Sequence, residues 1–177
     1  MASETDIPTT SAAWRTAAAE PDWIVVYRQR LPYIYNYFRY RLGSVAEAED
    51  LTAITFEKAW RGRHRYRRDV AAFSTWLLRI ARNVATDHLR AARAHAPIDE
   101  AADTPAGTTP EEEHTQASDF ARLAALVTQL PERERELLSL KFGAGANNRT
   151  IAQLMNMSES NVGTILHRTV QELRARW

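Results

Sequence analysis

Residues 76–90 read WLLRIARNVATDHLR, and at helical spacing this stretch has two faces of opposite character. One face is largely apolar and consists of Leu77, Ile80, Ala81, Val84 and His88. The other is entirely polar and consists of Arg79, Arg82, Asn83, Thr86 and Arg90. We expect a helix that packs on a small core and offers guanidinium and amide groups to a nucleic acid. Taken alone, the polar face is explained as simply by an ordinary solvated surface, so the flanking sequence has to decide.

The composition restricts the class of protein. The chain has 177 residues, of which 45% are hydrophobic and 25% charged, which is typical of a globular protein with one domain or two small ones. It has no cysteine, which excludes disulfides and thiolate metal sites and fits a reducing compartment. The five histidines lack metal-ligand spacing, so we expect no metal and no other cofactor. Without a secretory signal or a long apolar run, we expect a cytoplasmic protein that does not insert into a membrane.

Basic and acidic residues are segregated along the chain, although the net charge is only +1. Residues 61–68 read RGRHRYRR, whereas residues 94–121 contain acidic side chains and neither lysine nor arginine. Non-specific affinity for DNA comes mainly from neutralising phosphates. A chain with this balance is therefore expected to need a partner in order to bind DNA tightly.

The pattern predicts two all-helical domains, because no alternating β pattern of useful length occurs. Residues 1–20 are expected to form a disordered tail, and residues 96–118, rich in proline and acidic side chains, a flexible linker. Within the first domain, residues 21–95, we expect a helix split or kinked at Pro32 and ended by Gly43. A second helix to about Trp60, an arginine-rich loop and the opening helix complete it. Two small cores are expected in place of one large one.

The second domain, residues 119–177, carries the pattern of a helix-turn-helix. Arg149–Met155 is predicted to be a short helix, Asn156 and Met157 the turn, and Ser158 the N-cap of a second helix. Apolar positions from Val162 to Leu173 supply its inward stripe. This layout lets the second helix lie in a major groove, and a plain helical hairpin with a polar surface is the alternative. The side chains expected to face outward toward DNA are Ser160, Asn161, Thr164, His167 and Arg168.

Three segments together resemble the extracytoplasmic-function (ECF) sigma factors of the sigma-70 family. AEDLTAITFEKAWR at 48–61 is similar to the family's polymerase-binding segment, residues 73–90 to its reader of the promoter −10 element, and residues 130–174 to its −35 domain. The resemblance covers nearly everything after residue 20. It implies two small helical domains joined by an acidic flexible linker: sigma region 2, then a winged-helix-like helix-turn-helix domain, region 4.

The resemblance implies a subunit without chemistry of its own, not an enzyme, that binds core RNA polymerase and melts promoters. Asn83 matches the position that accepts a base flipped from the non-template strand, which suits an amide that both donates and accepts. The aromatic residues available for stacking are Tyr66, Phe73 and Trp76, of which the last two fit a core equally well. The residues implied for −10 contact are Arg65, Tyr66, Arg67, Arg68, Trp76, Arg79, Arg82, Asn83, Thr86, Asp87 and Arg90.

The same resemblance implies further partners and two departures. Polymerase contact, with the β and β′ subunits, would fall to Asp50, Leu51, Thr55, Phe56, Glu57, Trp60 and Arg61, and −35 contact to Arg149 and the outward residues of the second helix. An anti-sigma protein is also implied. The linker either threads toward the RNA path or is a solvated tether. Gly163 and Ile165 stand where the family commonly has basic residues, and Arg149-Thr150 replaces an acidic pair, so the −35 contact is expected to be weaker or differently specific.

A stand-alone helix-turn-helix regulator is the alternative to the sigma factor. Its N-terminal helices would sense a ligand or mediate dimerisation. That reading leaves the arginine-rich segment and the Asn83 face without a role.

Overall fold

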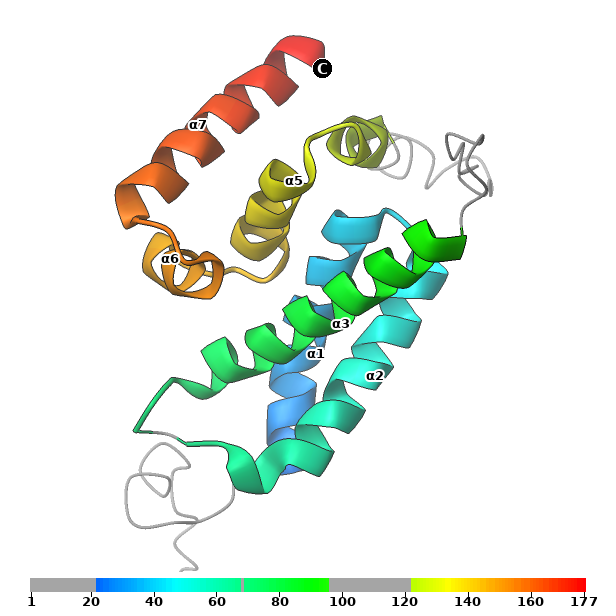
Figure 1. The fold of residues 1–177 in the computed structure, drawn as a ribbon, viewed down its shortest axis with the longest axis vertical. Coiled ribbons are helices and arrows are strands. Elements are labelled where there is room, and N and C mark those ends of the chain that lie inside the picture. The colour runs from blue at the N-terminus through cyan, green and yellow to red at the C-terminus, as the bar shows by residue number, and fades with distance from the viewer. Residues whose placement is uncertain (1–21, 68, 96–121) are drawn as a thin grey trace, which may run out of the picture.

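The computed structural model describes residues 22–67, 69–95 and 122–177, and every regular element in these ranges is helical (Figure 1). The predicted all-α fold is therefore confirmed. The expected tail (1–20), the expected linker (96–118) and Arg68 lie outside the described residues. No helix within the described part of the chain is long and apolar enough to span a membrane.

Helix α1, Trp23–Leu42, begins at Asp22, whose carboxylate accepts hydrogen bonds from the amides of Ile24 and Val25. It ends at Gly43, as predicted, with a φ of 81°. Of the two outcomes predicted at Pro32, a split or a kink, the split does not occur, because α1 continues through this residue. Pro32 and Arg28, whose carbonyl loses its hydrogen bond, are both exposed, so water can supply the missing partner.

Helices α2, Val45–Gly62, and α3, Phe73–His95, pack with α1 into an N-terminal three-helix domain (Figure 1). Ser44 caps α2 by accepting a hydrogen bond from the amide of Glu47. The arginine-rich segment is less irregular than expected: α2 extends to Gly62 and a 3-10 turn, η1, follows at Arg63–Arg65.

The C-terminal domain contains a short helix over 122–128, α5 (Glu132–Leu138), the π-helical turn η2 (Ser139–Gly143), α6 (Asn148–Met155) and α7 (Glu159–Arg176). The predicted helix-turn-helix is present as α6 and α7. Asn156 makes the turn in the left-handed conformation, and Ser158 accepts a hydrogen bond from the amide of Asn161. No strand occurs in the described residues of this domain.

The prediction of two separate cores is wrong, because the buried apolar residues of both domains form one contiguous cluster. Helix α1 contacts helices of both domains. Phe38, on this helix, is fully buried, and so is its neighbour Tyr37, whose Cα lies against Gly143 of η2. The C-terminal domain thus packs directly on α1 and α3, which brings the two predicted reading helices into one body (Figure 1).

Candidate nucleic-acid interface

The polar face of α3 is exposed except at Arg82. Leu77, Leu78, Ala81, Val84 and Ala85 are buried against the core. Between Phe73 and Arg90, the side chains that α3 exposes are those of Arg79, Asn83, Thr86, Asp87 and Arg90. Two local contacts order this face: Thr86 donates to the carbonyl of Arg82 at 2.9 Å, and Asp87 pairs with Arg90 at 3.9 Å. The two-faced helix predicted from residues 76–90 is therefore confirmed, except that Arg82, which was assigned to the polar face, is not exposed.

A cluster of aromatic rings lies at the N-terminal end of this face. The rings of Tyr66, Phe73 and Trp76 contact one another in edge-to-face or tilted arrangements, with centroids 5.2–5.3 Å apart. Trp23 continues the cluster, with its ring 5.7 Å from that of Phe73 and 5.4 Å from that of Trp60. Phe73 and Trp76 are half-buried and pack against the core. The two readings of these residues, core and stacking platform, are therefore compatible.

Arginines flank Tyr66 of the aromatic cluster in the sequence, and Arg63 contacts one of the rings. The guanidinium of Arg63 lies over the Trp60 ring, 4.0 Å from its centroid, in a cation–π contact. Arg63 was not among the residues predicted to contact the −10 element. Arg65 is exposed. Arg67 is exposed and donates to Asp69 at 2.6 Å, and this hydrogen bond lowers the pKa of the Asp69 carboxyl. In the sequence, the alternating arginines of residues 61–67 indicated that this segment is basic.

Arg82 is placed differently from the other polar residues of α3. Its Nε donates to Glu136 at 2.6 Å and its Nη1 to the carbonyl of Leu154, both in the C-terminal domain. Its side chain is only 25% exposed. The side chain of Arg82, which was predicted to contact DNA, therefore points toward the C-terminal domain and not toward the exposed face of α3.

The predicted −35 surface lies on α6 and α7. Ser160, Asn161, Thr164, His167 and Arg168 are all exposed on α7, and Arg149 is exposed in the first turn of α6. Arg168 is held by Glu134 at 2.7 Å.

A shallow hollow beside α7 adds a cation that the sequence reasoning missed. Lys141 donates to Asn148 at 2.9 Å and lines the hollow with His167 and Arg174. Only its position before the helix-turn-helix could have indicated it.

The predicted polymerase-binding segment divides between surface and core. Leu51, Thr55 and Phe56 are buried, and the Phe56 ring makes an edge-to-face contact with that of Tyr27 at 4.8 Å, so these side chains pack α2 against the core. Of the predicted polymerase contacts, Asp50, Glu57, Trp60 and Arg61 are exposed, and the neighbouring Ile54 is exposed as well. Ile54 follows Asp50 at i+4, which is the signal that would have placed it on this face.

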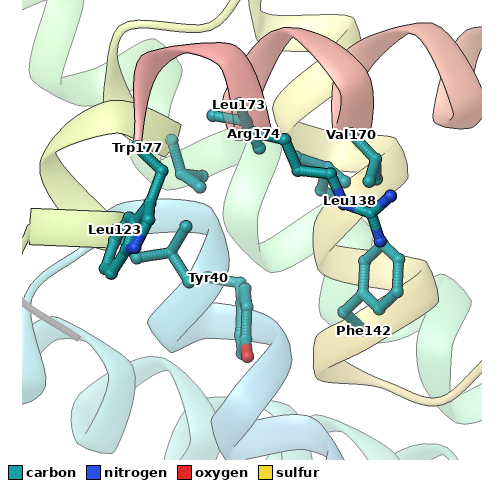
Figure 2. A pocket seen from close by; sticks show the side chains of 9 residues that line it. Tyr40, Leu123, Leu138, Phe142, Val170, Leu173, Arg174 and Trp177 are labelled. Atoms are coloured by element: carbon teal, nitrogen blue, oxygen red, sulfur yellow. The ribbon is translucent and has the colours of Figure 1, made fainter. Parts of the chain in front are cut away.

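An apolar cavity of about 290 Å³ lies where Tyr40 of α1 faces the C-terminal domain (Figure 2). Leu138, Val170 and Leu173 form part of its wall, and Trp177 and Arg174 lie at its edge (Figure 2). The predictions from the sequence did not include this cavity. The half-exposed rings of Phe142 and Trp177, at 53% and 48%, are its visible apolar rim.

Two family models match the chain: Sigma-70 region 2 over residues 26–95 and Sigma-70, region 4 over residues 120–173. The ECF RNA polymerase sigma factor BldN of Streptomyces coelicolor is 30% identical over 151 residues, covering 84% of this chain and 57% of BldN. The probable RNA polymerase sigma factor RfaY of Xanthomonas campestris is 31% identical, covering 73% of this chain but 34% of RfaY. The chain thus spans about half or less of these two relatives, but 89% of the ECF RNA polymerase sigma factor SigM of Bacillus subtilis, at 28% identity over 81% of this chain.

Two solved structures share the fold. The sigma factor RpoE from Bartonella quintana, in complex with the anti-sigma factor NepR, aligns with a TM-score of 0.67 at 18% identity, covering 87% of this chain and 95% of RpoE. CnrH in complex with the cytosolic domain of CnrY aligns at 0.58 and 21% identity, covering 86% of this chain and 82% of CnrH. At these identities the likeness supports the two-domain helical architecture alone.

Proposed function

Because the chain belongs to the sigma-70 family of RNA polymerase sigma factors, in its ECF group, we propose that it directs core polymerase to promoters by reading two DNA elements. Helix α3 and the aromatic cluster capture the melted −10 strand. Helices α6 and α7 read the −35 element. The exposed side of α2 binds the polymerase.

One juxtaposition carries the −10 assignment. Asn83 follows Trp76 by seven residues, so the two lie on the same side of α3, about 10 Å apart along its axis. The ring of Trp76 contacts that of Tyr66, and Arg79 is exposed between Trp76 and Asn83 along the helix. A single strand running along α3 therefore meets an aromatic platform, a cation for its backbone and an amide for a base edge, in that order.

The energetics of strand capture fit these groups. Extruding a base from a duplex costs a few kcal/mol, and stacking a base on an aromatic side chain returns about 1–3 kcal/mol. The Asn83 carboxamide can donate to and accept from one base edge, which adds selectivity that stacking lacks. Arg65 and Arg63 extend the cationic path beyond the aromatic cluster.

For the −35 element, we infer that base reading and phosphate contact are carried out by different residues of α6, α7 and their surroundings. Because Glu134 holds Arg168, the base-reading residues are the short polar ones, Ser160, Asn161 and Thr164, together with His167. Arg149 and Lys141 flank them and supply phosphate contacts. Gly163 and Ile165 are half-buried, so the family's usual basic positions are occupied here by residues that pack within the domain. We infer a −35 contact that depends on hydrogen bonds more than on charge.

The proposed partners are the β and β′ subunits of core polymerase, promoter DNA and an anti-sigma protein. The last is supported by the two solved relatives of the same fold, whose structures contain an anti-sigma factor or a partner domain. The acidic composition of residues 96–118 is consistent with a connection that runs toward the RNA path of the polymerase, where its carboxylates mimic the phosphates of nucleic acid.

Run-off transcription with purified core polymerase on a promoter library tests the proposal. Wild-type protein should give promoter-dependent transcripts, and Asn83→Ala should lower promoter opening at least tenfold without weakening polymerase binding. Gln29→Ala, which removes an exposed amide from α1, is the control and should transcribe normally. No promoter-dependent transcript from the wild type would overturn the sigma-factor proposal. Tight promoter binding without polymerase would favour the stand-alone regulator, and normal opening by Asn83→Ala would overturn base capture alone.

A further inference from the structure

The apolar cavity beside Tyr40 is too large to be an ordinary packing defect. Its volume is about 290 Å³, whereas voids in protein interiors are seldom larger than a water molecule. Tyr40 lines it from α1, and Leu138 of α5 and Leu173 of α7 line it from the C-terminal domain (Figure 2). Its surface is almost entirely apolar, and a buried water needs about two to four polar partners. The cavity therefore suits an apolar occupant better than water.

The size and shape of the cavity limit what can fill it. An engineered cavity of about 150 Å³ in another protein holds one benzene ring, so a cavity about twice as large has room for about twelve carbon atoms. The residues of α7 that line it extend from Val170 to Trp177, which is about 10 Å along the helix axis. An elongated space of this volume matches an unbranched chain of about ten carbons. The half-exposed rings of Phe142 and Trp177 lie at the edge, where a chain can enter.

A cation lies at the edge of the cavity. Arg174 follows Val170 by four residues on α7, and both side chains line the cavity (Figure 2). Arg168 and Arg176 on the same helix each pair with a glutamate, whereas no carboxylate among the described residues pairs with Arg174. The Arg174 guanidinium is therefore available to an anionic group on a ligand.

The shallow hollow beside α7 continues this positive edge. It shares Phe142, Val170 and Arg174 with the apolar cavity, so the two spaces are adjacent. Lys141 and His167 also line the hollow, and no aspartate or glutamate of the described chain lines either space. A group placed at Arg174 thus meets positive charge on one side and an apolar cavity on the other. This is the arrangement that an amphiphilic anion requires.

We propose that the cavity binds a single-chain fatty carboxylate of about ten carbons, with the chain inside and the carboxylate on Arg174. One guanidinium matches one carboxylate, to which it can donate two parallel hydrogen bonds. A phosphate dianion would call for a second cation at the same place, and Lys141 is already held by Asn148 at 2.9 Å. Burial of the chain supplies most of the affinity, because each methylene removed from water contributes, and Arg174 selects the head group.

Isothermal titration calorimetry of the full chain with decanoate tests the proposal. Decanoate should bind with saturable heat at one site per chain. Butanoate has the same head group but lacks most of the chain, so it should bind about a hundredfold more weakly or less. Decyltrimethylammonium has the same chain with the opposite charge and should bind about tenfold more weakly or less. No saturable heat from decanoate would overturn the proposal, and so would equally tight binding of decyltrimethylammonium.

Two substitutions at Val170 place the chain inside the cavity. This half-buried residue lines the cavity from α7, so Val170→Trp fills the space with an indole ring and should weaken decanoate binding about tenfold or more. Val170→Ala also removes the valine but leaves the space open, and its affinity should stay within about threefold. Far-UV circular dichroism and urea midpoints check that both variants are folded. Full-strength binding by a folded Val170→Trp variant would put the ligand elsewhere and overturn the proposal.

A substitution of the exposed Arg174 tests the head group without touching the core. Arg174→Gln should weaken binding of decanoate about tenfold and leave binding of uncharged 1-decanol within about twofold. Arg28→Gln removes an exposed cation from α1 and should change neither affinity. An unchanged affinity for decanoate in Arg174→Gln, or an equal loss for both ligands, would overturn the pairing with the carboxylate. Binding is measured without polymerase or DNA, so its outcome is independent of the transcription test.

Discussion

Gly43 ends α1 with a φ of 81°, a backbone conformation that costs an L-residue roughly 1–2 kcal/mol. A Cβ there would also lie 3.3 Å from the Thr128 methyl group. We expect Gly43→Ala to lower the free energy of unfolding by about 1–2 kcal/mol, measured by urea denaturation. Gly163→Ala is the opposite case, because this glycine is inside α7 and its Cβ would make an ordinary 3.5 Å contact with Asn148. It should stabilise by about 0.5–1 kcal/mol, and equal effects of the two changes would contradict the argument.

The carboxyl of Glu132 gives the molecule an acid-sensitive contact. The hydrogen bond from Arg93 and the charge of Arg41 hold the pKa of Glu132 below its ordinary value of 4.5. The unfolded chain therefore binds the proton more tightly, so the stabilisation is complete above pH 4.5 and is lost as the pH falls through the folded pKa.

We expect Glu132→Gln to make the loss of stability between pH 5 and pH 3 shallower than in the wild type. Urea midpoints measured at intervals across this range check it. Glu172→Gln, which removes a carboxylate from an exposed pair within α7, should leave the wild-type slope. Parallel curves for wild type and Glu132→Gln would show that this carboxyl does not link acid to unfolding.

Residue-level features set by neighbours in the sequence could be predicted. The caps at Ser44 and Ser158 and the glycine stop at Gly43 depend on hydrogen bonds or dihedral angles within a few residues. The placement of Arg82 could not, because its partner Glu136 is 54 positions away. A polar position on a helix indicates exposure to something other than the core, and it does not distinguish solvent, nucleic acid and a second domain.

At the scale of elements, α3 shows most clearly how one helix packs on the core with one face and exposes polar side chains on the other. Leu77 is 1% exposed on its buried face, whereas Arg79 is exposed on the polar one. We expect Leu77→Ala to cost about 2–5 kcal/mol of stability, because it leaves a cavity, and Arg79→Ala to stay within about 0.5 kcal/mol. Thermal and urea unfolding of both variants measures this. A large stability loss for Arg79→Ala would show that its face supports the fold.

Elements with strong local signals were predicted correctly, and those shaped by packing were not. The helix-turn-helix followed from its cap, its turn and its apolar spacing. The passage of α1 through Pro32 did not, because it depends on the lost hydrogen bond lying on the solvent side of the packed helix. The π-helical turn η2 also depends on packing, since it sets Gly143 against α1. Local propensity describes a helix in isolation, whereas its neighbours decide such details.

At the scale of the whole molecule, the sequence predicted the two domains but not their contact. Arg41 and Glu132 are 91 positions apart and bond at 3.1 Å. Helix α1 already had one satisfied apolar face, so its pattern did not require a second partner on the side of Tyr37 and Arg41. The residues predicted for −10 contact divide accordingly: Asn83 is exposed on α3, whereas Arg82 bonds to Glu136 of the C-terminal domain.

The contiguous core predicts how the molecule unfolds. Because α1 packs against both domains, separating them exposes buried side chains of each, so the wild type should unfold in one cooperative transition. Gly143→Ala weakens only the contact between domains, and the two should then unfold separately. In a Trp177→Phe background every tryptophan precedes residue 77, so fluorescence follows the N-terminal domain while far-UV circular dichroism follows both. The two urea curves should coincide for that background and diverge once Gly143→Ala is added; curves that diverge without Gly143→Ala would mean that the domains are energetically independent.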